Sequence, residues 1–187
     1  MFRSLLPLLI AALPGFCIPT VAAAEEQLAL FSPDGYRQTQ YRSPTPASAK
    51  GAQTLDTAAL QTLIAEEPDL VLVDVYRSQW LAGRFIDSEP HANLPGSIWL
   101  ANTGDGNLQP EWASYFSENL ARVSQGNMQR PLVFYCRSDC WLGWNATKRA
   151  HGLGYTRLYW YRDGVDGWEQ AGLPLHPATP EPLPGDE

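Results

Sequence analysis

The stretch Pro131–Leu142 constrains the fold more than any other part of the sequence. It opens with the apolar run Leu-Val-Phe-Tyr at positions 132–135, a composition typical of a buried strand in a parallel sheet. That run ends at Cys136, a short polar loop follows, and residues 141–152 have the pattern of a helix. The sequence therefore places Cys136 between the carboxyl end of a strand and a helix N-terminus, where ligands bind in open α/β sheets.

This position favours reactive chemistry at Cys136. Backbone N–H groups at a helix N-terminus carry partial positive charge, which stabilises a thiolate or a bound oxyanion. A cysteine in such a place tends to have a lowered pKa and to act as a nucleophile. Cys140 follows four residues later. Two interpretations stay open: the two cysteines form one thiol site, or they are small apolar side chains packed near each other.

Other segments repeat the alternation of apolar runs and helical spacing. Such alternation predicts an α/β fold, a parallel sheet with helices on both faces. Asp56 is suited to cap the first helix. Asp74 closes a strand and would point to the same edge as Cys136 if the two strands are parallel. The predicted strands are 70–75, 131–136, 156–161 and one after the turn at Pro95-Gly96; the predicted helices are about 55–64, a helical turn at 76–85, 110–123, 141–152 and a short one within 162–172.

The N-terminus has the features of an export signal. Arg3 precedes a short apolar run at 5–17, and the small residues 22–24 form a cleavage site, so residues 1–24 are predicted to be a signal peptide. No other apolar run is long enough to span a bilayer, so no membrane span is expected in the mature chain. The net charge of −7 argues against nucleic-acid binding, because phosphate contacts need a basic surface.

Cleavage of this signal would leave Cys136 and Cys140 as the remaining cysteines, since Cys17 lies within it. An exported protein meets oxidising conditions, so two cysteines four positions apart invite a disulfide. The loop that it closes would be very short and would add little stability through chain entropy. We therefore take a bridge that is made and broken as the hypothesis.

Two flanking segments differ in composition from the central part. Residues 25–53 are rich in Pro, Ser, Gln and Thr and carry a repeated Tyr-Arg pair at 36–37 and 41–42. They are either an extended arm that lies over the domain or a disordered linker. Residues 176–187 form a Pro-rich tail.

Three separated motifs follow one pattern: a strand closed by an aspartate, a Pro-Gly turn after a histidine, and a cysteine loop with a Gly-x-x-x-Trp-x-x-x-Gly-x-Pro closing segment. The motifs are Leu72-Val73-Asp74-Val75, His91 with Leu94-Pro95-Gly96-Ser97-Ile98, and Cys136-Arg137-Ser138 with residues 163–174. With these motifs, residues 54–175 resemble a rhodanese-like domain. The resemblance implies a central parallel sheet with helices on both faces and a sulfurtransferase-type cysteine.

A smaller group of that family gives a closer resemblance. The run Asp139-Cys140-Trp141 and the doubled Tyr-Arg pair resemble exported rhodanese-like proteins with a CXXCW motif, associated with PQQ-dependent alcohol catabolism. This resemblance implies a periplasmic location and a quinoprotein dehydrogenase or cytochrome c as partner. Two features depart from the general family: Cys140-Trp141 ends the loop where small residues are usual, and His91 lies two residues farther from its Pro-Gly. Both argue against plain thiosulfate sulfurtransferase activity.

The predicted site follows from these motifs. Cys136 and Cys140 are the catalytic candidates, and the substrate-binding candidates are Arg137, Ser138, Asp139 and Trp141. Cys136 would take a sulfane sulfur from a small sulfur donor as a persulfide, without another cofactor, and Cys140 would resolve it as a disulfide; in thiol–disulfide chemistry the partner would be a thiol. Arg137 would bind an anion, whereas Asp139 also suits a loop position or a helix cap.

Two other functions remain open. The cysteines, with His91 or His151, would suit a soft metal such as copper. Alternatively, the chain is an accessory protein without turnover, which binds a dehydrogenase or cytochrome through its arm and its Trp-rich loop.

Overall fold

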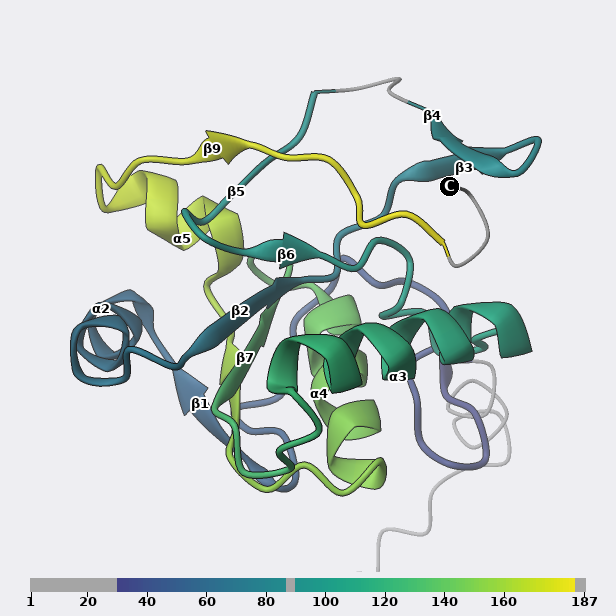
Figure 1. The fold of residues 1–187 in the computed structure, drawn as a ribbon, viewed down its shortest axis with the longest axis horizontal. Helices are drawn as coiled ribbons and strands as arrows, with labels where there is room; N and C mark the ends of the chain where they lie inside the picture. The colour runs from purple at the N-terminus through teal and green to yellow at the C-terminus, as the bar shows by residue number, and fades with distance from the viewer. Residues whose placement is uncertain (1–29, 87–89, 184–187) are drawn as a thin grey trace, which may run out of the picture.

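The structure is a computed structural model, and it describes residues 30–86 and 90–183. The predicted signal peptide, Cys17 and the first residues of the arm lie outside these ranges. In the described part, a central parallel sheet of five strands, in the order β1-β8-β7-β2-β6, is flanked by four helices (Figure 1). This confirms the predicted α/β fold. The strands are β1 (Ala52–Leu55), β2 (Val71–Asp74), β6 (Ile98–Trp99), β7 (Leu132–Tyr135) and β8 (Leu158–Tyr161).

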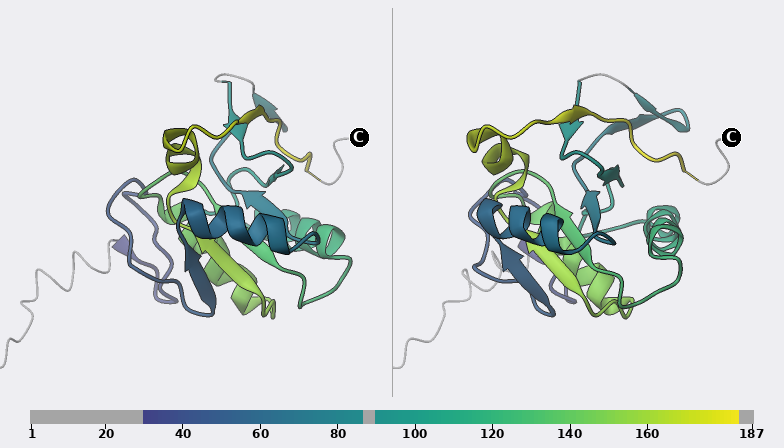
Figure 2. Two further views of the ribbon diagram at one scale, coloured as in Figure 1. Left: turned by 90° about the vertical axis from the view of Figure 1, so that its left-hand side faces the viewer. Right: turned by 60° about the vertical axis from the view of Figure 1, so that its left-hand side comes forward.

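The helices cover both faces of the sheet (Figures 1 and 2). Because successive side chains of a strand point to opposite faces, Phe134 packs in one cluster with residues of α3 and α4, and Val133 packs in another with residues of α2 and α5. Every residue of β7 is buried, as its apolar run predicts. The helices are α2 (Thr57–Glu66), α3 (Pro110–Ser124), α4 (Trp141–Gly152) and α5 (Gly164–Gln170).

Most predicted elements lie within two or three residues of their predicted bounds. Asp56 caps α2, where its side chain accepts a hydrogen bond from the N–H of Ala59. Strands β2 and β7 are parallel and place Asp74 opposite Tyr135. Asp74 and Cys136 therefore lie at the same edge of the sheet, as predicted.

The prediction of a helical turn at 76–85 is wrong. The segment forms an antiparallel hairpin of β3 (Gln79–Leu81) and β4 (Arg84–Ile86). Ala82 and Gly83 have φ values of 51° and 79°, which suit a two-residue hairpin turn. The Trp80 and Phe85 rings pack across the strands, with 4.7 Å between their centroids. This cross-strand pair stabilises a hairpin in place of the helix.

The flanking segments both return to the domain. Residues 30–51, drawn in purple to blue, lie against it in irregular structure (Figure 2). Strand β1, which was not predicted, extends the sheet beside β8. In the tail, β9 (His176–Pro177) pairs with β5 (Ala92–Asn93). Among the described residues, no helix combines the length and apolar character that crossing a bilayer requires.

Candidate functional site

Cys136 and Cys140 are joined by a disulfide, with 6.2 Å between their Cα atoms. Cys136 follows the last residue of β7, and Cys140 is the N-cap of α4. The predicted pairing of these cysteines is therefore present in the structure. Both are buried, with 2 % and 3 % of their surfaces exposed, so the bridge lies beneath other groups.

The loop between the cysteines turns sharply at Asp139, which has a φ of 47°. Aspartate is one of the few non-glycine residues that adopt this left-handed conformation readily. Asp139 does not cap α4, because the N-cap is Cys140 and no side chain there bonds the helix N-terminus. The interpretation of Asp139 as a helix cap is therefore wrong, whereas its interpretation as a loop residue agrees with the structure, in which its side chain is exposed.

A carboxylate of this chain occupies the polar face of the loop. Asp166 accepts hydrogen bonds from the N–H and the hydroxyl of Ser138 at 3.0 and 2.9 Å. It also accepts bonds from Nε and Nη2 of Arg137 at 3.1 and 2.7 Å. Arg42 adds an ion pair at 3.3 Å. The predicted binding residues Arg137 and Ser138 are thus brought together, with Asp166 as their common partner.

These bonds change the acidity of both partners. Partial burial would raise the pKa of Asp166, but the hydrogen bonds from Arg137 and Ser138 outweigh it and lower the pKa from 3.8 to about 2. The bond to Asp166 raises the pKa of Arg137 in turn. The carboxylate therefore stays ionised across the pH range in which proteins normally work. Asp166 lies within the closing motif but was not predicted to be a site residue.

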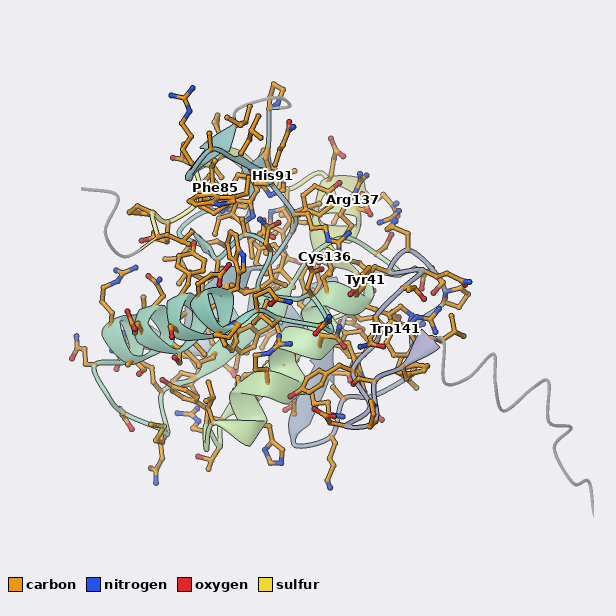
Figure 3. The ribbon with its side chains drawn as sticks, turned by 90° about the vertical axis from the view of Figure 1, so that its right-hand side faces the viewer. Tyr41, Phe85, His91, Cys136, Arg137 and Trp141 are labelled. Atoms are coloured by element: carbon orange, nitrogen blue, oxygen red, sulfur yellow. A yellow bond between two sulfur atoms is a disulfide. The ribbon has the colours of Figure 1, made fainter. Side chains whose placement is uncertain are left out.

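The N-terminal arm covers the other side of the disulfide. Arg42 forms an isolated antiparallel bridge with Cys140. The carbonyl of Tyr41 accepts the N–H of Trp141 at 2.9 Å, and the N–H of Ser43 donates to the carbonyl of Asp139 at 3.1 Å. Arg42 also donates to the carbonyl of Ser138 at 2.7 Å. In Figure 3, Cys136 lies between Arg137 and Tyr41, with Trp141 on the side of the arm.

Trp141, a predicted substrate-binding residue, contacts the arm in this structure. Its indole N–H donates to the hydroxyl of Ser43, and its ring meets that of Phe31 edge to face at 5.3 Å. The guanidinium of Arg37 lies 5.1 Å from the centre of each ring. Such cation–aromatic contacts contribute to binding when the cation is desolvated, and Arg37 is buried. Trp141 thus contacts the arm, with 8 % of its surface exposed.

A fully buried amide anchors the same arm. The side chain of Asn145 accepts a hydrogen bond from the N–H of Arg37 at 3.0 Å. Its amide nitrogen donates to the carbonyls of Arg37 and Gly104 at 2.8 and 2.9 Å. The amide thereby satisfies arm backbone groups as a neighbouring strand would. The sequence carried no clear signal for this contact, because Lys148 and Arg149 follow Asn145 on the same face of the helix.

The histidine of the Pro-Gly motif lies at the same edge of the sheet. Nε2 of His91 is 2.7 Å from Oδ2 of Asp74, whose carboxyl is fully buried. Burial raises the pKa of Asp74, and the bond to His91 opposes this shift. The ring of His91 stacks on Tyr76 with 5.1 Å between centroids and lies 4.2 Å from Trp99. The motif named His91 and Asp74, but the sequence did not predict that they pair.

Metal binding gains no support from this arrangement. No group of three or more His, Cys, Asp or Glu side chains within residues 30–86 and 90–183 is placed to hold an ion. The sulfur atoms of Cys136 and Cys140 are bonded to each other. His151 lies in the last turn of α4, the end of the helix opposite Cys140.

Comparison with known proteins identifies the family. The model of the rhodanese-like domain matches residues 56–171. The chain belongs to the rhodanese-like domain family. No curated protein matches the sequence. The fold is similar to that of a thiosulfate sulfurtransferase from Pseudomonas aeruginosa, with a TM-score of 0.50 and 14% identity over 73% of this chain and 22% of that chain.

Two smaller solved proteins are also similar. The polysulfide-sulfur transferase of Wolinella succinogenes has a TM-score of 0.45 and 18% identity over 67% of this chain and 79% of that chain. A human single-domain sulfurtransferase has a TM-score of 0.43 and 23% identity over 64% of this chain and 96% of that chain.

Proposed function

We propose that the chain is a rhodanese-like protein whose Cys136–Cys140 pair carries out thiol–disulfide exchange. One observation carries this proposal: the loop between the central strand and α4 holds two cysteines joined to each other. A bridge over so short a loop contributes little to stability through chain entropy, so its reactivity gives the better reason for its presence. In the reduced form, the helix N-terminus favours the thiolate of Cys136.

The exchange needs only the two cysteines and a partner with two thiols or a disulfide. In the oxidising direction, a partner thiolate attacks Cys136, the bridge breaks, and Cys140 leaves as a thiolate. A second partner thiolate then attacks the mixed disulfide and displaces Cys136. The partner leaves as a disulfide, and its two electrons remain on the two cysteine thiols. The reverse sequence regenerates the bridge with a partner disulfide as the oxidant.

Thiol counting and trapping test this function. The untreated protein should contain no free thiol at Cys136 or Cys140, and a thiol–disulfide buffer should convert it reversibly to a form with two. Cys140→Ser should accumulate a stable mixed disulfide on Cys136, because the resolving thiol is gone. A bridge that forms and breaks only after unfolding would contradict the proposal.

Sulfur transfer is the second candidate, and membership of the rhodanese-like family favours it. Reduced Cys136 would take a sulfane sulfur as a persulfide and pass it to an acceptor. In a competing reaction, the thiolate of Cys140 would attack the sulfur of Cys136. The outer sulfur would leave as hydrosulfide, and the Cys136–Cys140 disulfide would form. Cyanide-to-thiocyanate turnover separates the candidates. Sulfur transfer predicts that Cys136→Ser abolishes thiocyanate formation and that Cys140→Ser spares or raises it. Thiol–disulfide exchange predicts instead that either substitution abolishes activity.

We also propose that the protein works in the periplasm beside a quinoprotein dehydrogenase or a cytochrome c of PQQ-dependent alcohol oxidation. The export-type N-terminus and the resemblance to the CXXCW group support this setting. Fractionation should find the mature chain outside the cytoplasm without residues 1–24. Crosslinking of the Cys140→Ser protein in cells grown on alcohol should recover such a partner. Failure to recover one would contradict the proposed partner but not the proposed chemistry of the Cys136–Cys140 pair.

A further inference from the structure

The polar face of the loop has the composition of an oxyanion site. A backbone N–H, a hydroxyl and two guanidinium groups converge there, from Ser138, Arg137 and Arg42. Guanidinium and backbone N–H groups are the donors that bind sulfate-like and carboxylate groups in proteins. In this chain the bound oxyanion is the side chain of Asp166 (Cys136 and Arg137 are marked in Figure 3).

We infer that Asp166 determines the substrate class of this site. Its carboxylate fills the oxyanion site of the loop and excludes sulfur donors that carry an oxyanion group, such as thiosulfate. The sulfur that reacts with Cys136 then belongs to a thiol or disulfide without such a group. This inference about the substrate rests on the proposed reactivity of Cys136, whereas the binding of Asp166 in the oxyanion site does not depend on that reactivity.

The internal carboxylate competes well against a free anion. Asp166 is already held in place, so its effective concentration at the site exceeds that of a dissolved donor. It carries a full negative charge at neutral pH. A dianion that approaches Arg137 must displace this charge or lie beside it, and like charges at such distances repel. The net charge of −7 adds long-range repulsion of anions.

Asp166 is not required to hold α5 against the loop, because backbone contacts already do so. The N–H of Val165 donates to the carbonyl of Cys136 at 3.1 Å. Gly164 has a φ of 59°, and a Cβ there would lie 2.5 Å from the carbonyl carbon of Arg137. Glycine at this position therefore allows the close approach. Removal of the Asp166 carboxylate should leave the loop formed and its donors free.

Anion binding to the oxidised full-length protein tests the inference. Sulfate is the probe, because it does not react with a disulfide, and calorimetry or tryptophan fluorescence measures its affinity. Asp166→Ala should bind sulfate at least on the order of tenfold more tightly than the unchanged protein, since several charge-assisted hydrogen bonds become available. Asp166→Asn, which keeps an oxygen near Ser138, should show a smaller gain. Glu169→Gln removes one charge from the exposed side of the same helix and should show none.

Two results would overturn the inference: equal sulfate affinity in Asp166→Ala and the unchanged protein, or an equal gain in Glu169→Gln. If Asp166→Ala is too unstable to purify, Asp166→Asn decides the question alone. Turnover separates the two proposals. A lower KM for thiosulfate in reduced Asp166→Ala supports the inference together with sulfur transfer at Cys136. Tighter sulfate binding in Asp166→Ala without any thiol reactivity at Cys136 supports the occupied oxyanion site and contradicts the proposed function.

Discussion

The two sides of the disulfide loop are built from different kinds of contact. On one side, the arm is held by backbone bonds, an exposed ion pair, the rings around Trp141 and one buried amide, that of Asn145. On the other side, the buried Asp74–His91 pair belongs to the sheet edge itself, beside cavities of about 130 and 330 Å³ that His91 helps to line. Segments with few buried apolar contacts open more easily than a core. The arm side should therefore open for a partner, and the histidine side should stay fixed.

The largest effect is expected on the fixed side. His91→Ala would leave the fully buried Asp74 carboxyl without its side-chain partner. Breaking a buried pair is costly, so the free energy of unfolding should fall by about 3 kcal/mol. Denaturant unfolding measures this loss. His151→Ala, at an exposed position of α4, should change it by less than about 0.5 kcal/mol.

Asn145→Ala should loosen the arm and cost about 2 kcal/mol, because buried groups of Arg37 and Gly104 lose their partners. Trypsin cleavage after Arg37 or Arg42 should become at least several times faster at native conditions. Asn107→Ala, which removes an exposed amide, is the matched control. If Asn145→Ala leaves cleavage unchanged, the arm does not open separately from the domain and the contrast between the two sides fails.

The Asp166 ion pairs predict a pH dependence. The pKa of Asp166 is lowered to about 2 in the folded state, so the pairs stabilise the fold above pH ~4 and lose this effect as the pH falls toward 2. Because the group is partly exposed, we expect a contribution of about 1–2 kcal/mol at pH 7. The difference in unfolding free energy between the unchanged protein and Asp166→Asn should shrink over that interval. A constant difference from pH 7 to 2 would contradict the assignment.

Local patterns predicted the position of Cys136 and the sheet edge that it shares with Asp74. Both features follow from apolar runs of strand length, and such runs can be recognised from residues that are adjacent in the sequence. The hairpin at 79–86 escaped prediction because the packing of Trp80 on Phe85 and Trp112 overrides local spacing.

The polar half of the site escaped prediction for a related reason. Arg42 and Asp166 are 124 positions apart, and Arg137 and Asp166 are 29 apart. Single-sequence patterns carry no information on such pairs. The family resemblance identified the cysteine loop and the closing motif separately. That the Asp166 carboxylate of the closing motif binds Arg137 and Ser138 of the loop is seen only in the fold.

The smallest effect is expected from substitution of Arg42, which tests directly whether the arm side of the disulfide loop opens. Its side chain is half-exposed, so Arg42→Ala should lower the unfolding free energy by less than about 0.5 kcal/mol. Loss of its bond to the Ser138 carbonyl should nevertheless speed reduction of the disulfide by a small thiol about twofold. Stopped-flow fluorescence measures this rate, with Arg84→Ala in the exposed hairpin as the control. If reduction is unchanged in both Arg42→Ala and Asn145→Ala, the thiol reaches the bridge by a route other than the arm.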